Sequence, residues 1–201
     1  ILVNYGGKVF AQELHLPLWL DSIGTGIVAC VLGPVNGALC GVTNNIIYGM
    51  SNPNSYYYAI TSVAIGLIIG IGMKKGMFRH LFGAITVSVF VSLASVIIST
   101  PFNVFYWNGL SGNVWGDGLY GMLTTNGWNH ILATALGELF VDFPDKVITV
   151  LITYVVMRML FFTKITSNKE HIAGKKKKEE RKVTKMLSLI LLISISILSM
   201  N

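Results

Sequence analysis

Charged residues are scarce in this sequence, and their scarcity excludes an ordinary soluble protein. Asp, Glu, Lys and Arg make up 12% of the 201 residues, against about 25% in an average soluble domain. Apolar residue types make up 53%. With so few charges to place on a surface in water, the composition predicts that lipid surrounds much of the protein.

Recognisable catalytic motifs are also lacking. The sequence has no HExxH, GxSxG, P-loop or CxxC pattern. Its four histidines are scattered without the spacing of metal ligands, and Cys30 and Cys40 lie in apolar segments, where we expect small core residues. We therefore predict that the chain is not an enzyme and needs no metal or cofactor. A membrane enzyme that uses Glu138 or His130 is the least favoured alternative.

Basic charge is concentrated near the end of the sequence. Residues 1–163 hold six Lys/Arg and six Asp/Glu, so the net charge of +6 arises from residues 164–185, where nine Lys/Arg oppose three Glu. No aromatic residue interleaves this run, which argues against nucleic-acid binding. An excess of Lys/Arg is typical of cytoplasmic segments beside a membrane span and attracts anionic lipid. We interpret 164–185 as a basic cytoplasmic tail.

The apolar segments predict an all-α integral membrane protein, a six-helix bundle formed by residues 1–163. Residues 1–12 are too short to cross a bilayer, which takes about 20 residues, so we expect a truncated first helix and a chain that is part of a longer protein. Proline begins a helix but cannot continue one. Gly33-Pro34 therefore predicts a tight turn between helices over 18–32 and 34–50.

Three further spans follow, with a polar, glycine-rich insert between the last two. Pro101 is expected to end the fifth helix and Pro144 to begin the sixth. The expected segments are helices over 56–73, 81–102 and 144–163, the insert over 103–128, and a short helix over 129–141. Residues 186–201 form a short apolar segment, which could begin a further span.

The basic segments predict the orientation of the bundle in the plasma membrane of a bacterium. Cytoplasmic loops carry the excess Lys/Arg, so loop 74–80 and the tail lie inside, while loop 51–55 and the segment 103–143 lie outside. Both ends of the bundle are then cytoplasmic. The alternative makes 118–141 a full span and places the basic tail outside, against the same rule.

Small residues recur at a spacing of four. Gly33, Gly37 and Gly41 line one face of the third helix, and Gly66 and Gly70 repeat the pattern on the fourth. Such faces let two helix backbones approach closely in lipid. Packing within the bundle and contact with a partner subunit are the two interpretations.

Polar residues gather near the predicted outer ends of the helices. Ionisable groups in a membrane protein are costly to bury and tend to be functional. Asp21, Asn44, Glu138, Asp142 and Lys146 are therefore candidates for a substrate site. The structural alternatives are helix capping by the aspartates and an ion pair of Lys146 with a nearby carboxylate.

The insert adds flat rings and amides, of which Trp107, Trp115 and Asn129 are candidates for the same site. Rings that stack and amides that donate hydrogen bonds suit a small ligand that contains a ring. The alternative is an aromatic belt at the membrane interface with an ordinary loop.

Two segments resemble a known family. The stretch LPLWLDSIGTGIVACVLGPVNGALCGVTNNIIYG (Leu16–Gly49), with its Gly-Pro-x-x-Gly turn and small-residue helix, resembles the substrate-binding S components of energy-coupling factor (ECF) transporters. The stretch GELFVDFPDKVITVLI (Gly137–Ile152) is similar to the segment before the last helix in one branch of these proteins.

The resemblance implies capture of a vitamin or related metabolite from outside, followed by uptake with a transmembrane coupling subunit and two cytoplasmic ATPases. Asp21, Asn44, Trp107, Trp115, Asn129, Glu138, Asp142 and Lys146 would then line the ligand cavity, and Gly33, Gly37 and Gly41 would pack helices or contact a subunit. The remaining alternative is a membrane sensor domain of a longer signalling protein.

Overall fold

The computed structural model describes residues 1–161, Lys178 and Arg181. The predicted all-α fold is confirmed for this part of the chain, which contains helices and their connections and no strand. The chain divides into a compact unit, Ile1–Met157, and a second unit, Arg158–Asn201. In the second unit, residues 158–161, Lys178 and Arg181 are helical. The predicted segment 186–201 and the rest of the basic tail lie outside the described residues.

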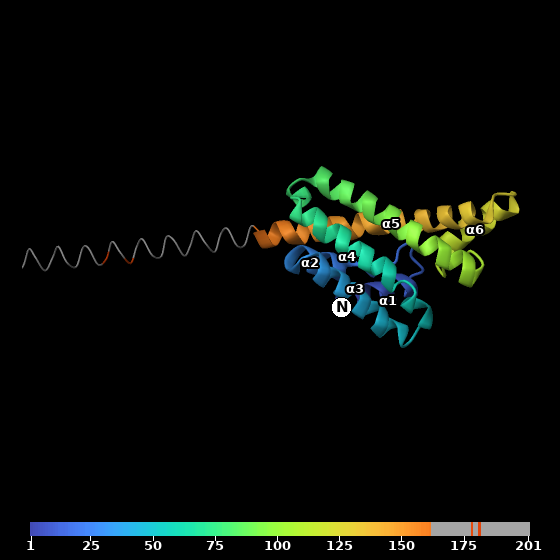
Figure 1. Cartoon of the computed structure of the whole chain (residues 1–201), viewed down its shortest axis with the longest axis horizontal. Helices are drawn as coiled ribbons and strands as arrows, with labels where there is room; N and C mark the ends of the chain where they lie inside the picture. Colours follow the sequence, from blue (N-terminus) through green and yellow to red (C-terminus); the bar gives the residue numbers. More distant parts are fainter. Residues whose placement is uncertain (162–177, 179–180, 182–201) are drawn as a thin grey trace, which may run out of the picture. The chain divides into compact units, whose positions relative to one another are not determined.

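The first unit is a bundle of long helices with one extra short helix (Figure 1). Residues 130–161 form the last helix of the described part, and its first 28 residues, 130–157, belong to this unit. The other elements are α1 (Leu2–Glu13), α2 (Ile23–Leu32), α3 (Pro34–Gly49), α4 (Ala59–Lys74), α5 (Leu81–Trp107) and α6 (Val114–Thr125), with 3₁₀ turns at Pro53–Tyr56 and Met77–Arg79.

The predicted turn between the second and third helices is confirmed. Gly33 separates α2 from α3 and has a φ of 96°, a conformation that favours glycine. Pro34 is the first residue of α3, where its missing N–H costs nothing.

Two predicted helix boundaries are wrong. Pro101 lies inside α5, which continues to Trp107. Pro144 lies inside the last helix, so the short helix over 129–141 and the span from 144 are one element. A proline inside a helix forfeits one backbone hydrogen bond. Buried residues on both sides of Pro101, Ser99 and Asn103, hold α5 against its neighbours.

The polar insert contains a helix that the glycines concealed. Asn113 precedes α6, and its side-chain oxygen accepts a hydrogen bond from the backbone N–H of Trp115 (3.1 Å), as an N-cap residue does. Asp117, in the first turn of α6, accepts hydrogen bonds from the backbone N–H groups of Ser111 (2.7 Å) and Gly112 (3.1 Å). This side chain folds the loop before α6 back onto the helix.

Glycines let α3 pack against both of its neighbours. A Cβ on Gly37 would lie 2.4 Å from the Cβ of Ala29 on α2, and one on Gly41 would lie 2.8 Å from the Cβ of Ser62 on α4. On α4, a Cβ on Gly66 would lie 2.4 Å from the backbone N of Ala38. The glycine spacing therefore serves packing within the bundle.

Buried polar groups are unusually frequent inside the bundle. Among the described residues, 23 buried ones are polar or charged and 16 are apolar. Asn4 is an example: its Nδ2 donates to Thr25 Oγ1 (2.9 Å), and its Oδ1 accepts from the backbone N–H of Gly24 (2.6 Å). These bonds attach α1 to α2.

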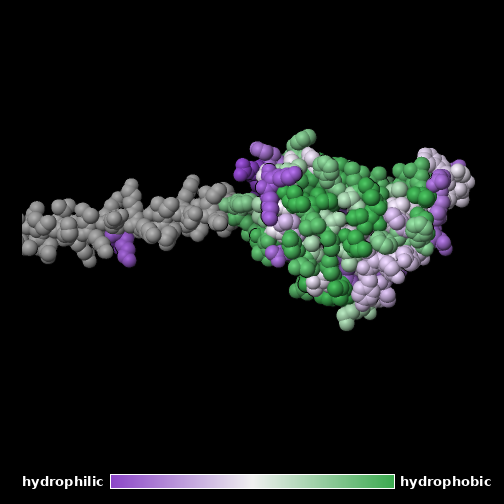
Figure 2. All heavy atoms as spheres, in the orientation of Figure 1, coloured by the Kyte–Doolittle hydropathy of each residue, from purple (hydrophilic) through white to green (hydrophobic). Residues whose placement is uncertain are grey.

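Large apolar side chains lie on the outside instead. Figure 2 shows a broad apolar belt on the visible face, with polar groups toward both ends of the bundle. Exposed members include Leu39 on α3, Phe90 and Ile97 on α5, and Phe140 on the last helix. Within the described part of the chain, one helix, α5, is long and apolar enough to cross a membrane.

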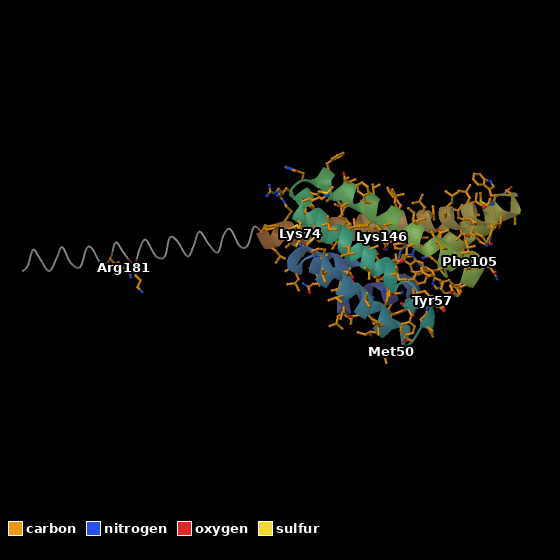
Figure 3. The ribbon with its side chains drawn as sticks, viewed as in Figure 1. Met50, Tyr57, Lys74, Phe105, Lys146 and Arg181 are labelled. Atoms are coloured by element: carbon orange, nitrogen blue, oxygen red, sulfur yellow. The ribbon has the colours of Figure 1, made fainter. Side chains whose placement is uncertain are left out.

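The connections are distributed between the two ends of the bundle. The Gly33 turn and the 75–80 loop lie at one end, and the loops around 50–58 and 108–113 lie at the other (Figure 1). Figure 3 shows Lys74 near the first end, Met50, Tyr57 and Phe105 near the second, and Lys146 between them. The charged side chain of Lys146 therefore lies between the two ends of the bundle.

Substitution of Gly66 by alanine is expected to destabilise the bundle by about 1–3 kcal/mol, because the new methyl group overlaps the α3 backbone. The matched control is Gly6→Ala on α1, where a Cβ would meet nothing within 4 Å. Thermal unfolding in lipid nanodiscs measures both. Equal melting temperatures for the two variants would contradict this account of helix packing.

Candidate functional site

A cavity of about 350 Å³ lies within the bundle. Its walls come from α1, α4, α5, the first turn of α6, the last helix and three of the connections. The residues that line the cavity include Lys8, Trp19, Asp21, Tyr58, Thr61, Ser95, Ser99, Trp107, Asp117, Glu138, Asp142 and Lys146.

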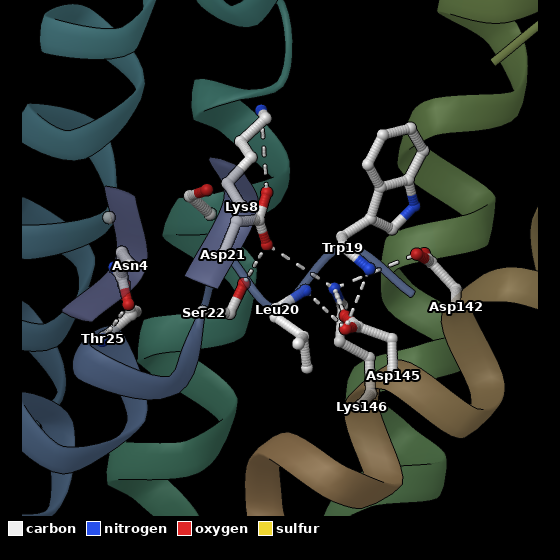
Figure 4. Close-up of polar contacts among 12 residues, drawn as sticks. Asn4, Lys8, Trp19, Leu20, Asp21, Ser22, Thr25, Asp142, Asp145 and Lys146 are labelled. Atoms are coloured by element: carbon white, nitrogen blue, oxygen red, sulfur yellow. Dashed lines mark hydrogen bonds and ion pairs between the residues drawn. The ribbon is translucent and has the colours of Figure 1, made fainter. Parts of the chain in front are cut away.

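Lys146 is the centre of a buried ion-pair network (Figure 4). Its Nζ lies 2.6 Å from Asp145 Oδ2, 3.8 Å from Asp142 Oδ1 and 3.9 Å from Asp21 Oδ1. The side chain of Lys146 is 3% exposed. A buried ammonium is tolerated only when acidic partners compensate its charge, and this one has three.

Asp145 attaches the connection between α1 and α2 to the last helix. Its Oδ1 accepts hydrogen bonds from the backbone N–H groups of Trp19 (3.0 Å) and Leu20 (2.7 Å), while its Oδ2 accepts from Lys146. Asp145 is fully buried. Asp145 lies in the interior of a continuous helix and therefore not at a helix N-terminus.

Asp21 joins the network to α1. Its Oδ2 lies 3.8 Å from Lys8 Nζ, and its Oδ1 accepts a hydrogen bond from Ser22 Oγ (2.7 Å). Burial by itself raises the pKa of Asp21, but the ammonium groups of Lys146 and Lys8 outweigh it and hold this pKa below its usual range. Asp21 is therefore an ionised partner in the network.

Glu138 lies one helical turn before Asp142 and faces α5. Its carboxylate accepts hydrogen bonds from Ser99 Oγ (3.1 Å) and from the side-chain amide of Asn103. Glu138 and Asp142 lie on one face of the helix because they are four residues apart. Both line the cavity, and neither caps a helix, so the capping alternative for Asp142 is also wrong.

Aromatic side chains form a second wall of the cavity. The rings of Tyr58 and Trp107 stack with their centroids 5.7 Å apart, and Tyr58 Oη donates to Asn103 Oδ1 (2.6 Å). Trp19 lines the cavity from the connection that Asp145 holds. The cavity therefore combines acidic groups with flat ring surfaces.

Five of the eight residues predicted to bind substrate line this cavity: Asp21, Trp107, Glu138, Asp142 and Lys146. They come from three separate parts of the chain: the connection between α1 and α2, α5 and the last helix. The structure brings them together, and their role in binding a substrate stays a prediction.

The other three predicted residues lie elsewhere. Asn44 is buried in α3, outside the cavity lining. Trp115 is 52% exposed and donates from Nε1 to the backbone carbonyl of His15 (2.7 Å). Asn129 accepts a hydrogen bond from the N–H of Ile131 (2.9 Å) and thereby caps the last helix. Their contacts support the fold.

Several cavity residues were not predicted. Lys8 is the one charged residue in residues 1–12, and an isolated charge in an apolar segment is a recognised signal of function. Ser95 and Ser99 line the cavity from α5. They belong to a buried polar face whose spacing of three or four residues could have indicated it: Ser88, Ser92, Ser95, Ser99 and Asn103. Trp19 gave no signal, because its place depends on Asp145.

No protein-family model matches the chain, and no curated protein or solved structure is significantly similar to it. The arrangement of side chains therefore carries the functional argument. A partly open cavity with acidic, cationic, hydroxyl and aromatic groups can hold a small polar molecule by ion pairs, hydrogen bonds and stacking.

Replacement of Asp145 by leucine is expected to destabilise the protein by about 3–5 kcal/mol, because Lys146 loses its closest partner in a buried site. Asp145→Asn should cost less, since the amide oxygen can still accept from the N–H groups of Trp19 and Leu20. Thermal unfolding orders the two variants, and limited proteolysis should show cleavage in residues 14–22 of the leucine variant first. A leucine variant as stable as the asparagine variant would contradict the role assigned to Asp145.

Proposed function

We propose that this chain is a membrane-embedded subunit that captures a small molecule, a vitamin or related metabolite, from outside the cell for ATP-driven uptake. The observation that carries the proposal is the cavity of about 350 Å³ lined by buried charges in a bundle whose outside is apolar.

The distribution of polar groups supports a multi-pass protein of the plasma membrane. A soluble bundle buries its apolar side chains and exposes charge. Here polar residues outnumber apolar ones among the buried residues described, and the large apolar side chains face outward. Small residues between α3 and α4 and prolines inside two helices are typical of helices in lipid.

The cavity supports binding as the role of this subunit. Buried ionisable groups in a membrane protein are expensive and are retained at sites for solutes, ions or protons. The cavity residues come from the two ends of the sequence, Lys8 and Asp21 on one side and Glu138 and Lys146 on the other. A site assembled in this way exists only in the folded bundle.

The energising partners follow from the resemblance to ECF S components. Such a subunit works with a transmembrane coupling subunit and two cytoplasmic ATPases, and this sequence has no P-loop of its own. In this proposal the basic tail 164–185 is cytoplasmic and contacts anionic lipid.

Native mass spectrometry of the full-length protein, purified gently from its own host, is expected to reveal a bound small molecule together with the coupling and ATPase subunits. Such an assembly would support transport and give the mass of the substrate. A protein with neither, joined instead to a kinase or cyclase domain, would favour the sensor alternative.

Cysteine labelling in intact cells tests the orientation. In a background in which both native cysteines are replaced by alanine, Ser51→Cys should react with a membrane-impermeant maleimide. Lys75→Cys should react only after the cells are permeabilised, because the basic loop is cytoplasmic. Both positions are exposed, so access to each is limited by the membrane alone. The reverse pattern would contradict the orientation, and labelling of both in intact cells would contradict a membrane between them.

A further inference from the structure

We propose that the captured solute carries a positively charged nitrogen, which binds between the carboxylates of Asp142 and Glu138 and the aromatic rings of the cavity. This inference rests on the proposed function, because it specifies the chemical class of the solute. It is carried by the charges around the cavity, by unpaired polar atoms and by the aromatic wall.

The acidic groups around the cavity outnumber the basic ones. Four of the lining residues carry carboxylates, namely Asp21, Asp117, Glu138 and Asp142, and two carry ammonium groups, namely Lys8 and Lys146. Both ammonium groups are already engaged in ion pairs.

No ion pair of the Glu138 carboxylate is found within residues 1–161. Its partners Ser99 and Asn103 are neutral. A buried charge without an opposite partner costs several kcal/mol, and a cationic solute would supply that partner.

Two polar atoms at the cavity lack hydrogen-bond partners within the described structure. These are Asp142 Oδ2 and Thr61 Oγ1, which belong to residues 3% and 6% exposed. Buried polar atoms in folded proteins nearly always have partners. A carboxylate oxygen accepts hydrogen bonds and attracts positive charge, so the unpaired oxygen of Asp142 fits an ammonium or a protonated ring nitrogen.

The rings at the cavity suit the same class of ligand. Trp19, Tyr58 and Trp107 line it, and the face of an aromatic ring attracts a cation. The volume of about 350 Å³ is near the lower end of small-molecule pockets, which run from about 300 to 1,000 Å³. The site therefore fits a molecule of one or two rings.

The alternatives leave the charges unbalanced. An anionic solute would need a free ammonium group, but Lys8 and Lys146 already serve the carboxylates. A neutral solute would give the Glu138 carboxylate no opposite charge, and burial then favours its protonated form. A bound cation lowers the free energy cost of burying ionised carboxylates.

The first test compares probes of one shape on the full-length protein in lipid nanodiscs. The probes are benzyltrimethylammonium, benzylamine, benzyl alcohol and benzoate, with binding measured by quenching of tryptophan fluorescence. We expect the two cations to bind at least about tenfold more tightly than the alcohol or benzoate, from ion pairing and cation–π contacts. Equal or tighter binding of the alcohol or benzoate would overturn the inference.

The second test compares variants with the same probes. Asp142→Asn and Glu138→Gln should each weaken binding of benzyltrimethylammonium by about tenfold and leave that of benzyl alcohol nearly unchanged. The matched control is Glu13→Gln, which removes an exposed carboxylate at the end of α1 and should change neither. Equal loss for both probes would show that the carboxylates are structural and would overturn their assigned role. The probe comparison needs no variant and remains decisive where a variant fails to fold.

Native mass spectrometry separates failure of this inference from failure of the proposed function. A co-purified solute that carries a cationic nitrogen supports both. A co-purified solute that is neutral or anionic overturns the cation inference and leaves solute capture standing. The absence of any bound solute, together with no binding of the four probes, contradicts solute capture itself.

Discussion

The pairing of Lys146 with its carboxylates is the interaction on which the candidate site depends. Asp145 holds the ammonium at 2.6 Å and, through its other oxygen, the backbone of the α1–α2 connection. That connection supplies Asp21 and Trp19 to the cavity. One lysine therefore fixes the position of two elements that are remote in sequence. Buried ion pairs are costly to form, which fits a pair kept for the geometry it imposes.

The apolar belt and the polar interior have a common origin. In lipid, apolar contact between helices offers no gain over contact with acyl chains, so helices associate through close backbone packing and hydrogen bonds. The contact of Gly66 with α3 is an example of close backbone packing, and the bonds between Asn4 and α2 are an example of hydrogen bonding. Helices that associate in this way do not need large apolar side chains between them, so serine, threonine and charged side chains can occupy the interior.

Most of the helices were predicted from the sequence, but the continuation of two helices through a proline was not. The apolar runs and the Gly33-Pro34 step gave α3, α4 and the end of α2 nearly as the structure has them, because these boundaries depend on local preferences. The start of α2 was wrong, because it was predicted at residue 18 and lies at Ile23. Pro101 and Pro144 misled, because packing on both sides of a proline can outweigh its local cost. The helix α6 was concealed by its glycines, whose local preference opposes a helix.

Some residues of the candidate site were predicted from the sequence, and the position of others depends on the fold. Charged residues in apolar segments indicated Asp21, Glu138, Asp142 and Lys146 without knowledge of the fold, and all four line the cavity. Trp115 and Trp107 have the same residue type in one insert, yet only Trp107 reaches the cavity. The orientation of each ring depends on how the helices and loops around it pack. That packing cannot be predicted from the local sequence.

The hydrogen bond from Leu20 to Asp145 also constrains the order in which the molecule can fold. These residues are 125 positions apart, and His15 and Leu20 have φ values of 50° and 53°, a conformation that costs a residue other than glycine roughly 1–2 kcal/mol. The connection therefore has no local reason to adopt its final shape during synthesis. It reaches that shape only after the last helix has been made. The cavity is thus completed at the end of folding, and a nascent chain that has produced only α1 to α5 does not yet possess it.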